Sequence, residues 1–286
     1  MKALDKLVTR LEKADRLDAV AAPVGAAVSR AVQPRAVRNL LSGTWLGHAL
    51  HPVLTDVPTG AWSMATLLDL VGGESAESAA DLLVGVGIMS AVPTSATGLN
   101  DWSDTMGAES RVGVAHASAN VAALGLYAGS LLARRAGHRR RGTVLGLAGL
   151  AALSVGGYLG GHLAFANAVN VNHTAFEHRP GDWTSVLTES QLEEGQPRQV
   201  VSGDATIMLV RHGGHIYALA NRCSHLGGPL DEGQIIDGCV QCPWHQSTFR
   251  LHDGHIVRGP ASAPQPTYDV RVQAGDIEVR ARGARA

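Results

Sequence analysis

Four residues in the C-terminal third of the chain have the types and spacing of metal ligands. Cys223 and His225 form a Cys-x-His pair, and after sixteen intervening residues Cys242 and His245 form a Cys-x-x-His pair. Thiolates are soft ligands and imidazoles borderline ones, so two of each suit either zinc or an iron–sulfur cluster. A common zinc finger takes two cysteines from one turn and two histidines from a helix, whereas here each short loop contributes one of each. The order of the residues therefore favours an iron–sulfur cluster over zinc.

This double motif resembles that of the Rieske family of [2Fe–2S] proteins, in which two cysteines hold one iron and two histidines hold the other. The resemblance covers about residues 182–286. It implies that Cys223 and Cys242 bind the buried iron and that His225 and His245 bind the outer iron. The second ring nitrogens of both histidines would then lie near the surface, where an electron can leave and can be coupled to a proton.

The departures from the family pattern bear on the reduction potential. Respiratory Rieske proteins carry an extra cysteine in each ligand loop, and Gly228 and Trp244 stand at the matching positions, so that disulfide cannot form. Of the two hydroxyls that raise the potential in those proteins, Ser247 is present and the tyrosine is replaced by Phe249. Fewer hydrogen bonds stabilise the reduced cluster less, so the resemblance implies the low-potential ferredoxin and dioxygenase type. Gly259-Pro260-Ala261 matches the proline-containing loop that covers the cluster.

Two neighbouring residues complete the motif region. Cys239 forms Cys-x-x-Cys with Cys242 but lies outside the pattern, and we expect it to be a small buried side chain. Gln246 stands where the family usually has glycine. Only about forty residues follow His245, too few for the mononuclear iron domain of a Rieske oxygenase, so we expect an electron carrier.

The elements that must position these loops are strands. Residues 206–221 contain two β-rich runs around Gly213-Gly214, which predict a hairpin. The runs TYDVRV and DIEVRA near the end predict two more short strands, and no long helical pattern follows residue 182. We therefore expect an all-β Rieske domain over 182–286, preceded by a polar linker over 169–181.

The middle of the chain has the composition of membrane helices. A weaker candidate span at 54–71 contains Asp56 and Asp69 and would cross only in company with others. Three runs lack Asp, Glu, Lys and Arg and are long enough to cross the hydrocarbon core: 82–99, 112–133 and 142–166. A buried soluble helical bundle is the alternative. We predict a multi-domain protein, with an all-α four-helix transmembrane domain over 45–168 ahead of the β domain.

Residues 1–44 form the remaining segment, which we predict to be amphipathic and helical. Within residues 2–24, leucines mark one helical face and Lys and Arg another. Such a helix either lies on an anionic membrane surface or packs on the rest of the protein, and the pattern fits both.

The predicted membrane domain is rich in histidine. The segments HPVLTDVPTG, HASAN and GGYLGGHLAFA resemble an uncharacterised bacterial family of four-span membrane domains. If all four spans cross, ionisable residues gather on one side of the membrane, among them His48, His51, His116 and His162. Ionisable groups in a membrane are costly and often functional. Three interpretations stay open: a structural polar network, a quinone or proton-linked redox site, and haem b ligation.

The net charge of −1 gives no reason to expect a nucleic-acid partner. We expect one-electron transfer through a membrane-anchored [2Fe–2S] cluster, with a redox protein or a quinone as partner. The alternatives are a subunit of a quinone-linked membrane oxidoreductase and a redox-sensing iron–sulfur protein. We expect a multi-pass protein of the cell membrane with its Rieske domain in the cytoplasm, where clusters are assembled. The arginine-rich loop at 134–141 and the basic N-terminal segment both favour the cytoplasm. Three predicted spans separate them, so only one of the two can lie on that side.

Overall fold

The computed structural model describes residues 2–282, which divide into two compact units. The helical unit comprises Met1–Gln33 and Leu50–Val169, and the β unit comprises Pro34–Ala49 and Asn170–Ala286. We expected residues 1–44 to form one N-terminal segment. The structure instead groups the stretch from Pro34 onward with the strands, because helix α3 (Arg35–Ser42) contacts strand β8 (Ile256–Arg258).

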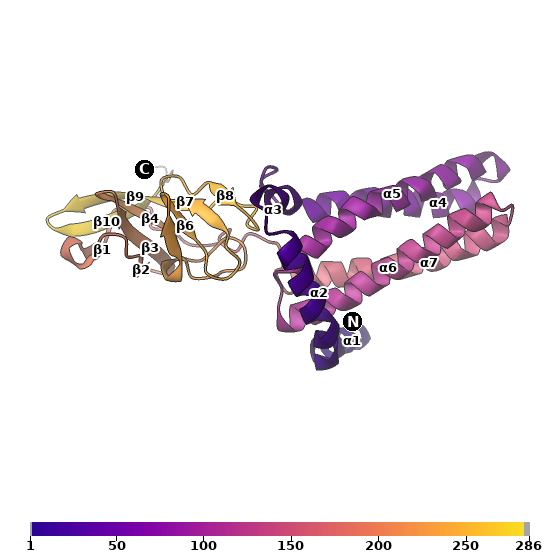
Figure 1. Cartoon of the computed structure of the whole chain (residues 1–286), viewed down its shortest axis with the longest axis horizontal. Coiled ribbons are helices and arrows are strands. Elements are labelled where there is room, and N and C mark those ends of the chain that lie inside the picture. The colour runs from indigo at the N-terminus through magenta and orange to yellow at the C-terminus, as the bar shows by residue number, and fades with distance from the viewer. Residues whose placement is uncertain (1, 283–286) are drawn as a thin grey trace. The chain divides into compact units, whose positions relative to one another are not determined.

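Four long helices dominate the helical unit, and two shorter ones precede them. In Figure 1 the long helices run side by side, and the most extensive contacts join α4 to α5 and α6 to α7. The helices of the unit are α1 (Lys2–Glu12), α2 (Asp18–Ala31), α4 (Leu50–Val71), α5 (Glu77–Trp102), α6 (Gly107–Arg135) and α7 (Arg139–Phe165). The single helix expected over 2–24 is broken by a 3₁₀ turn at Asp15–Leu17.

Glycines allow the long helices to approach closely. Trp62 of α4 stacks on Tyr127 of α6, with ring centroids 4.4 Å apart. A Cβ atom at Gly87 would lie 2.2 Å from the Trp62 ring, and one at Gly149 would lie 2.8 Å from the Tyr127 ring. Small residues at such positions let large aromatic side chains fill the interior of a bundle, as in membrane helix packing.

Two of the described helical segments are long and apolar enough to span a membrane. They are Glu74–Trp102, which includes α5, and Arg139–Phe165, which is α7. Only 28% of each apolar window is buried, whereas the core helix of a soluble protein is mostly buried. The prediction of four long helices is confirmed, and that of four spans stays a prediction, since α4 and α6 do not meet the same criterion.

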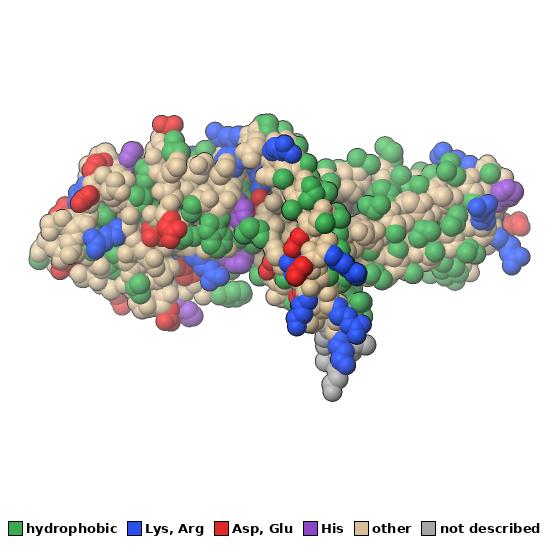
Figure 2. Space-filling model, turned by 60° about the horizontal axis from the view of Figure 1, so that its bottom comes forward, with side chains coloured by type: hydrophobic (Ala, Val, Ile, Leu, Met, Phe, Trp, Pro, Cys, Tyr) green, Lys and Arg blue, Asp and Glu red, His purple; other side chains and the backbone are tan. Residues whose placement is uncertain are grey.

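All four long helices expose large apolar side chains. Figure 2 shows hydrophobic groups along the length of the bundle and Lys and Arg gathered near one end of it. A belt of this kind is unusual on a soluble protein and suits contact with lipid. Exposed members include Val57 and Met64 on α4, Leu82, Met89 and Val92 on α5, Val121 and Leu132 on α6, and Val144 and Val155 on α7.

The charged residue that weakened the first predicted span is paired inside the bundle. The side chain of Asp69 on α4 is 2% exposed and forms ion pairs with Arg134 of α6 and Arg139 of α7. Both arginines also pair with Asp81 of α5. One network thus joins four helices, and it explains how a carboxylate is accommodated within an apolar bundle.

The N-terminal helix packs on the bundle. Val8 of α1 is buried against Val112 and Leu159, and Glu12 lies 3.3 Å from His162 of α7. These contacts support the packed interpretation of the amphipathic pattern, although Leu4 keeps about half of its surface exposed.

The β unit contains two antiparallel sheets among the described residues. One has the order β1-β10-β9-β4-β3-β2 and the other the order β5-β6-β7-β8. The strands are β1 (Thr184–Thr188), β2 (Arg198–Ser202), β3 (Ala205–His212), β4 (His215–Ala220), β5 (Gln234–Ile236), β6 (Cys239–Gln241), β7 (Thr248–Arg250), β8 (Ile256–Arg258), β9 (Thr267–Gln273) and β10 (Asp276–Ala281).

Both predicted pairs of strands form hairpins with two-residue turns. His212 pairs with His215 across Gly213-Gly214, where φ is 61° and 77°. Two successive residues with positive φ define a type I′ turn, which is why two glycines suit this position. Strands β9 and β10 are joined in the same way through Ala274-Gly275. The all-β prediction for this part of the chain is confirmed.

Candidate metal centre

The four predicted ligands lie on two loops of similar construction. In the loop after β4, the backbone N–H of Cys223 donates to Gly228 O and that of Gly227 donates back to Cys223 O, both at 2.9 Å. In the loop after β6, Cys242 N–H donates to Ser247 O at 2.8 Å and Gln246 N–H donates to Cys242 O at 3.1 Å. Each cysteine is therefore held at the start of a closed backbone turn, with its histidine inside the turn.

The two loops bring like residues together. The thiols of Cys223 and Cys242 are hydrogen bonded to each other, and both residues are buried in the core that underlies the smaller sheet. The rings of His225 and His245 lie with centroids 5.1 Å apart and planes at 86°. The cysteine pair thus faces the interior and the histidine pair lies beside it.

This pairing fits two irons better than one zinc ion. Within residues 2–282, no group of three or more His, Cys, Asp and Glu side chains converges on a point where a single ion could be held. A tetrahedral zinc site needs all four ligands around one point. A Rieske cluster needs two cysteines at one iron and two histidines at the other, which is how these side chains are grouped.

The protonation states also suit metal ligands. The pKa of Cys242 is lowered to about 7, because the Cys223 thiol and the backbone N–H groups of Trp244 and His245 stabilise its thiolate, which is the form that binds metal. Burial and the neighbouring charges of His245, Arg38 and His173 lower the pKa of His225 well below its usual value. Its imidazole is therefore neutral, as a ligand must be.

The two histidines differ in exposure, which the sequence did not predict. We expected both imidazoles near the surface, but His225 is only 5% exposed while His245 is partly exposed. The expectation is wrong for His225. Next to His225 in the chain, Ser224 O accepts a hydrogen bond at 3.0 Å from the backbone N–H of His173, a residue outside 182–286.

Gly228 and Trp244, which stand where respiratory Rieske proteins carry the cysteines of their disulfide, lie against each other. A Cβ atom at Gly228 would be 3.1 Å from the Trp244 ring and 2.8 Å from Cys242 Sγ. The indole therefore fills the space in which respiratory Rieske proteins are expected to have their disulfide, and it is 53% exposed.

The loop of Gly259-Pro260-Ala261, the third loop of the site, is fixed to the second ligand loop through a buried hydroxyl. Ser247 is fully buried, and its Oγ accepts a hydrogen bond from Ala261 N–H at 3.0 Å. The hydroxyl hydrogen of Ser247 remains for another acceptor, in agreement with its expected role toward the cluster. The Gly259-Pro260 peptide bond in this loop is cis, and Phe249 lies fully buried in the adjoining core.

Three polar residues that the sequence analysis missed hold the first ligand loop, and Gln265 is the first of them. Gln265 is 2% exposed, and its side chain accepts from Ser224 N–H at 3.0 Å and donates to the carbonyls of Ala220 and Arg222 at 2.7 Å. The only feature of the sequence that marks this glutamine is its place between two prolines (Pro264 and Pro266), and its hydrogen-bond partners lie about forty residues away.

A pair of polar side chains, of which Asn221 is buried and Asp231 is partly exposed, closes the same loop. Asn221 Nδ2 donates to Asp231 Oδ1 at 2.6 Å, and Asp231 N–H donates to Asn221 Oδ1 at 2.8 Å. This reciprocal bond joins the two ends of the loop that carries the first Cys-x-His pair.

The neighbouring residues singled out in the motif behave differently. Cys239 lies on β6 and is partly exposed, with its Sγ 3.7 Å from Asp237 O, so the expectation of a buried side chain is wrong. Successive side chains on a strand point to opposite faces, and on β6 it is the neighbouring Val240 that is fully buried in the core. Gln246 adopts a φ of 63°, the left-handed conformation for which a glycine is usual.

The structure brings together two of the four membrane-domain histidines. The rings of His51 and His116 lie with centroids 6.4 Å apart. His162 instead contacts Glu12 of α1, and His48 belongs to the β unit, where its Nδ1 lies 3.1 Å from Ala49 O. The predicted cluster of four histidines is therefore reduced to one pair within the helical unit.

Both ring nitrogens of His116 are already hydrogen bonded. Its Nδ1 lies 2.8 Å from Gly156 O, and its Nε2 lies 3.2 Å from Asn120 Nδ2. Nδ1 of His51 lies 3.0 Å from Thr94 O. Haem ligation by His116 would require one of its bonds to be given up, so the geometry favours the structural network among the three interpretations.

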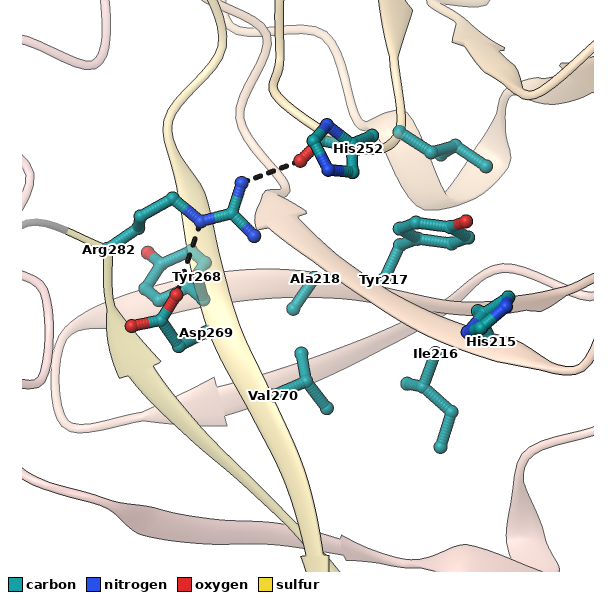
Figure 3. Close-up of a pocket in the computed structure, with 10 residues that line it drawn as sticks. His215, Ile216, Tyr217, Ala218, His252, Tyr268, Asp269, Val270 and Arg282 are labelled. Atoms are coloured by element: carbon teal, nitrogen blue, oxygen red, sulfur yellow. Dashed lines mark hydrogen bonds and ion pairs between the residues drawn. The ribbon is translucent and has the colours of Figure 1, made fainter.

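The β unit also has a surface hollow of about 410 Å³ that contains none of the four predicted ligands. Figure 3 shows Arg282 at its edge, where the guanidinium donates to the carboxylate of Asp269 and to the carbonyl of His252. The remaining wall comes from β4 and β9 and includes Tyr217 and Tyr268. These ion pairs and aromatic side chains fix one side of the domain and add nothing to the metal centre.

Two sequence families match the chain. Residues 182–269 match the Rieske [2Fe-2S] domain, and residues 47–173 match a family described as predicted membrane protein (DUF2231). Both resemblances inferred from the motifs are thus confirmed. The cofactor of the β unit is a [2Fe–2S] cluster, for which the paired cysteines and histidines provide the appropriate donors.

Curated relatives are ferredoxin subunits and a larger protein. The chain is 32% identical over 98 residues to the anthranilate 1,2-dioxygenase ferredoxin subunit of Burkholderia cepacia, covering 34% of this chain and 91% of that protein. It is 42% identical over 89 residues to the 3-phenylpropionate/cinnamic acid dioxygenase ferredoxin subunit of Escherichia coli (strain K12), covering 31% and 83%. It is 34% identical over 97 residues to Apoptosis-inducing factor 3 of Homo sapiens, covering 34% of this chain and only 16% of that protein.

The two relatives that are matched over most of their length are named as ferredoxin subunits of dioxygenases, and the residues that match them account for about a third of this chain. The chain therefore belongs to the Rieske [2Fe–2S] family and carries, ahead of its Rieske domain, a domain of the predicted membrane protein family (DUF2231).

Proposed function

We propose that this protein is a membrane-anchored electron carrier, in which Cys223 and Cys242 hold one iron and His225 and His245 hold the other. The observation that carries the proposal is the grouping of the four side chains into a buried cysteine pair and an adjacent histidine pair. The cluster accepts and releases one electron at a time. The chain itself supplies the two closed ligand loops and the buried Ser247 hydroxyl.

The partner we propose is a redox protein. The curated relatives of high coverage are named as ferredoxin subunits of dioxygenases, and such a name describes a protein that delivers electrons to a separate catalytic subunit. The partly exposed His245 ring is the exit that the geometry offers for the electron, since His225 is buried.

The anchor we propose is the four-helix bundle α4–α7. Two of its helices meet the criterion for spanning, all four expose apolar side chains, and the ion-pair network accommodates Asp69. An even number of crossings returns the chain to the side on which it began, and we place that side in the cytoplasm.

The test is the metal content and magnetic spectrum of full-length protein purified in detergent. We expect two irons and two acid-labile sulfides per chain and the electron paramagnetic resonance signal of a histidine-ligated [2Fe–2S] cluster. His225→Ala and His245→Ala should each abolish that signal, because either change opens the ligand set of one iron. His255→Ala, at an exposed histidine of the same unit, should leave the signal intact. Stoichiometric zinc without sulfide would contradict the proposal.

A further inference from the structure

The stretch Pro34–Ala49 precedes the membrane helices in the sequence but belongs to the β unit. Its helix α3 lies outside both family matches, which cover residues 47–173 and 182–269. The ferredoxin relatives match about a third of this chain, so their similarity gives no function for this segment. Its contacts with the β unit therefore need an explanation of their own.

One side chain attaches the segment to the third loop of the metal centre. Asn39 Nδ2 donates to Val257 O at 3.2 Å, and Asn39 Oδ1 accepts from Gly259 N–H at 2.8 Å. The amide thus satisfies one acceptor and one donor of a backbone more than two hundred residues away. A primary amide is suited to this double contact because it carries a donor and an acceptor side by side.

The segment holds this asparagine in place and packs closely on the loop. Gly43 ends α3 with a φ of 75°, and both N–H and Oγ1 of Thr44 donate to the Asn39 carbonyl. A Cβ atom at Gly259 would lie 3.1 Å from Thr44 Cγ2 and 3.4 Å from Ser42 Cβ. The absence of a side chain at Gly259 allows this approach.

The third loop is therefore held at two points. Asn39 binds it at Gly259, and Ser247 of the second ligand loop binds it at Ala261. Its position over the ligands depends on a segment of the chain that is remote in sequence as well as on the Rieske domain itself.

We propose that Pro34–Ala49 is an internal cap of the cluster site, in which Asn39 is a positioning residue for the third loop. This inference rests on the proposed function, because it takes the four ligands as assigned. It predicts that the loop and the reduction potential both respond to changes in a helix that lies outside the Rieske domain.

The first arm of the test measures amide hydrogen exchange of Gly259 in full-length protein in detergent. Asn39→Ala should speed exchange roughly ten-fold, which is the effect of losing one hydrogen bond of ordinary strength. Asn39→Asp keeps the acceptor for Gly259 N–H and should retain most of the protection. Arg35→Gln, at an exposed residue of the same helix, is the control and should leave exchange unchanged.

The second arm measures the reduction potential of the same proteins by electron paramagnetic resonance. Asn39→Ala should raise it, because water admitted at the loop stabilises the charged reduced form. Arg35→Gln should keep a potential close to that of wild type. Loss of the cluster from Asn39→Ala alone would also support the cap.

The outcomes separate the cap from the proposed function. Wild-type protein without two irons and two sulfides would contradict the proposed function. If every variant keeps its cluster and the exchange of Gly259 in Asn39→Ala is unchanged, the positioning role of Asn39 is overturned.

Discussion

Gly228 lies directly against the sulfur of Cys242, so that a Cβ atom at this position would be 2.8 Å from Sγ. A sulfur atom cannot tolerate a carbon at that distance, and the same Cβ atom would also lie only 3.1 Å from the Trp244 ring. The two ligand loops therefore meet at a point where only glycine fits.

Gly228→Ala should reduce the amount of cluster per chain several-fold, because Cys242 must move away from its position opposite Cys223. Iron and sulfide analysis of purified protein measures the loss. Gly181→Ala is the control, since a Cβ atom there meets nothing within 4 Å, and it should retain full occupancy. Full occupancy in Gly228→Ala would show that the loops are farther apart than the geometry indicates.

The two cysteines of the Cys-x-x-Cys sequence should behave oppositely. Cys242→Ser should lose the cluster or alter its spectrum grossly, because a thiolate ligand is replaced by a hydroxyl. Cys239→Ser should keep the cluster with an unchanged spectrum, since this side chain is partly exposed on β6 and its Sγ lies 3.7 Å from Asp237 O. An essential Cys239 would contradict the ligand assignment.

Hydrogen bonds near the cysteine ligands should set the reduction potential. Ser247→Ala should lower it by on the order of 50 mV, since a one-electron couple moves about 59 mV for each 1.4 kcal/mol of lost stabilisation. Phe249→Tyr should raise it, because a phenol at this buried position adds a donor near the ligand sulfur. Redox titration of both variants provides the measurement, and a potential unchanged in each would mean that neither side chain reaches the cluster.

The ion-pair network in the helical unit should stabilise the bundle strongly. Arg134→Ala leaves the buried Asp69 carboxylate with fewer cationic partners, and we expect a loss of about 3 kcal/mol in the free energy of unfolding. The neighbouring Arg135→Ala, at an exposed position, should cost less than about 0.5 kcal/mol. Thermal unfolding in detergent compares the two, and equal losses would exclude the network as their cause.

The histidine pair of the helical unit should serve the packing of the helices. His116→Ala removes bonds to Gly156 O and Asn120, and we expect lower thermal stability with an unchanged [2Fe–2S] spectrum and no haem b spectrum in wild type. Thermal stability, the [2Fe–2S] spectrum and the haem spectrum can all be measured on detergent-purified protein. A haem spectrum lost in His116→Ala, or slower reduction of the cluster by quinol in native membranes, would instead support a redox site.

The side of the membrane on which the Rieske domain lies can be measured directly. A fluorescent protein fused after the C-terminus should fluoresce, because such domains fold in the cytoplasm, and alkaline phosphatase fused in the 136–138 loop should be active on the opposite side. The reverse pattern would contradict the cytoplasmic placement.

Short-range patterns in the sequence were enough to predict the family and the secondary structure around the site. The spacing of Cys223 from His225 and of Cys242 from His245 lies within single loops, and the Gly213-Gly214 turn lies between two strands that are adjacent in the chain. Such features depend on neighbouring residues and on the backbone conformations that those residues allow, so they can be inferred without knowledge of the fold.

Only the tertiary structure decided which partners distant residues take. Asn39 binds Gly259 and Gln265 holds the first ligand loop, although neither belongs to a local pattern. Asp69 looked unfavourable in a membrane span until Arg134, sixty-five residues away, was found beside it. His225 was expected near the surface, but the fold leaves it only 5% exposed. The pairing of polar groups across long separations depends on how whole elements pack, because burial makes an unpaired group costly wherever its partner lies in the chain.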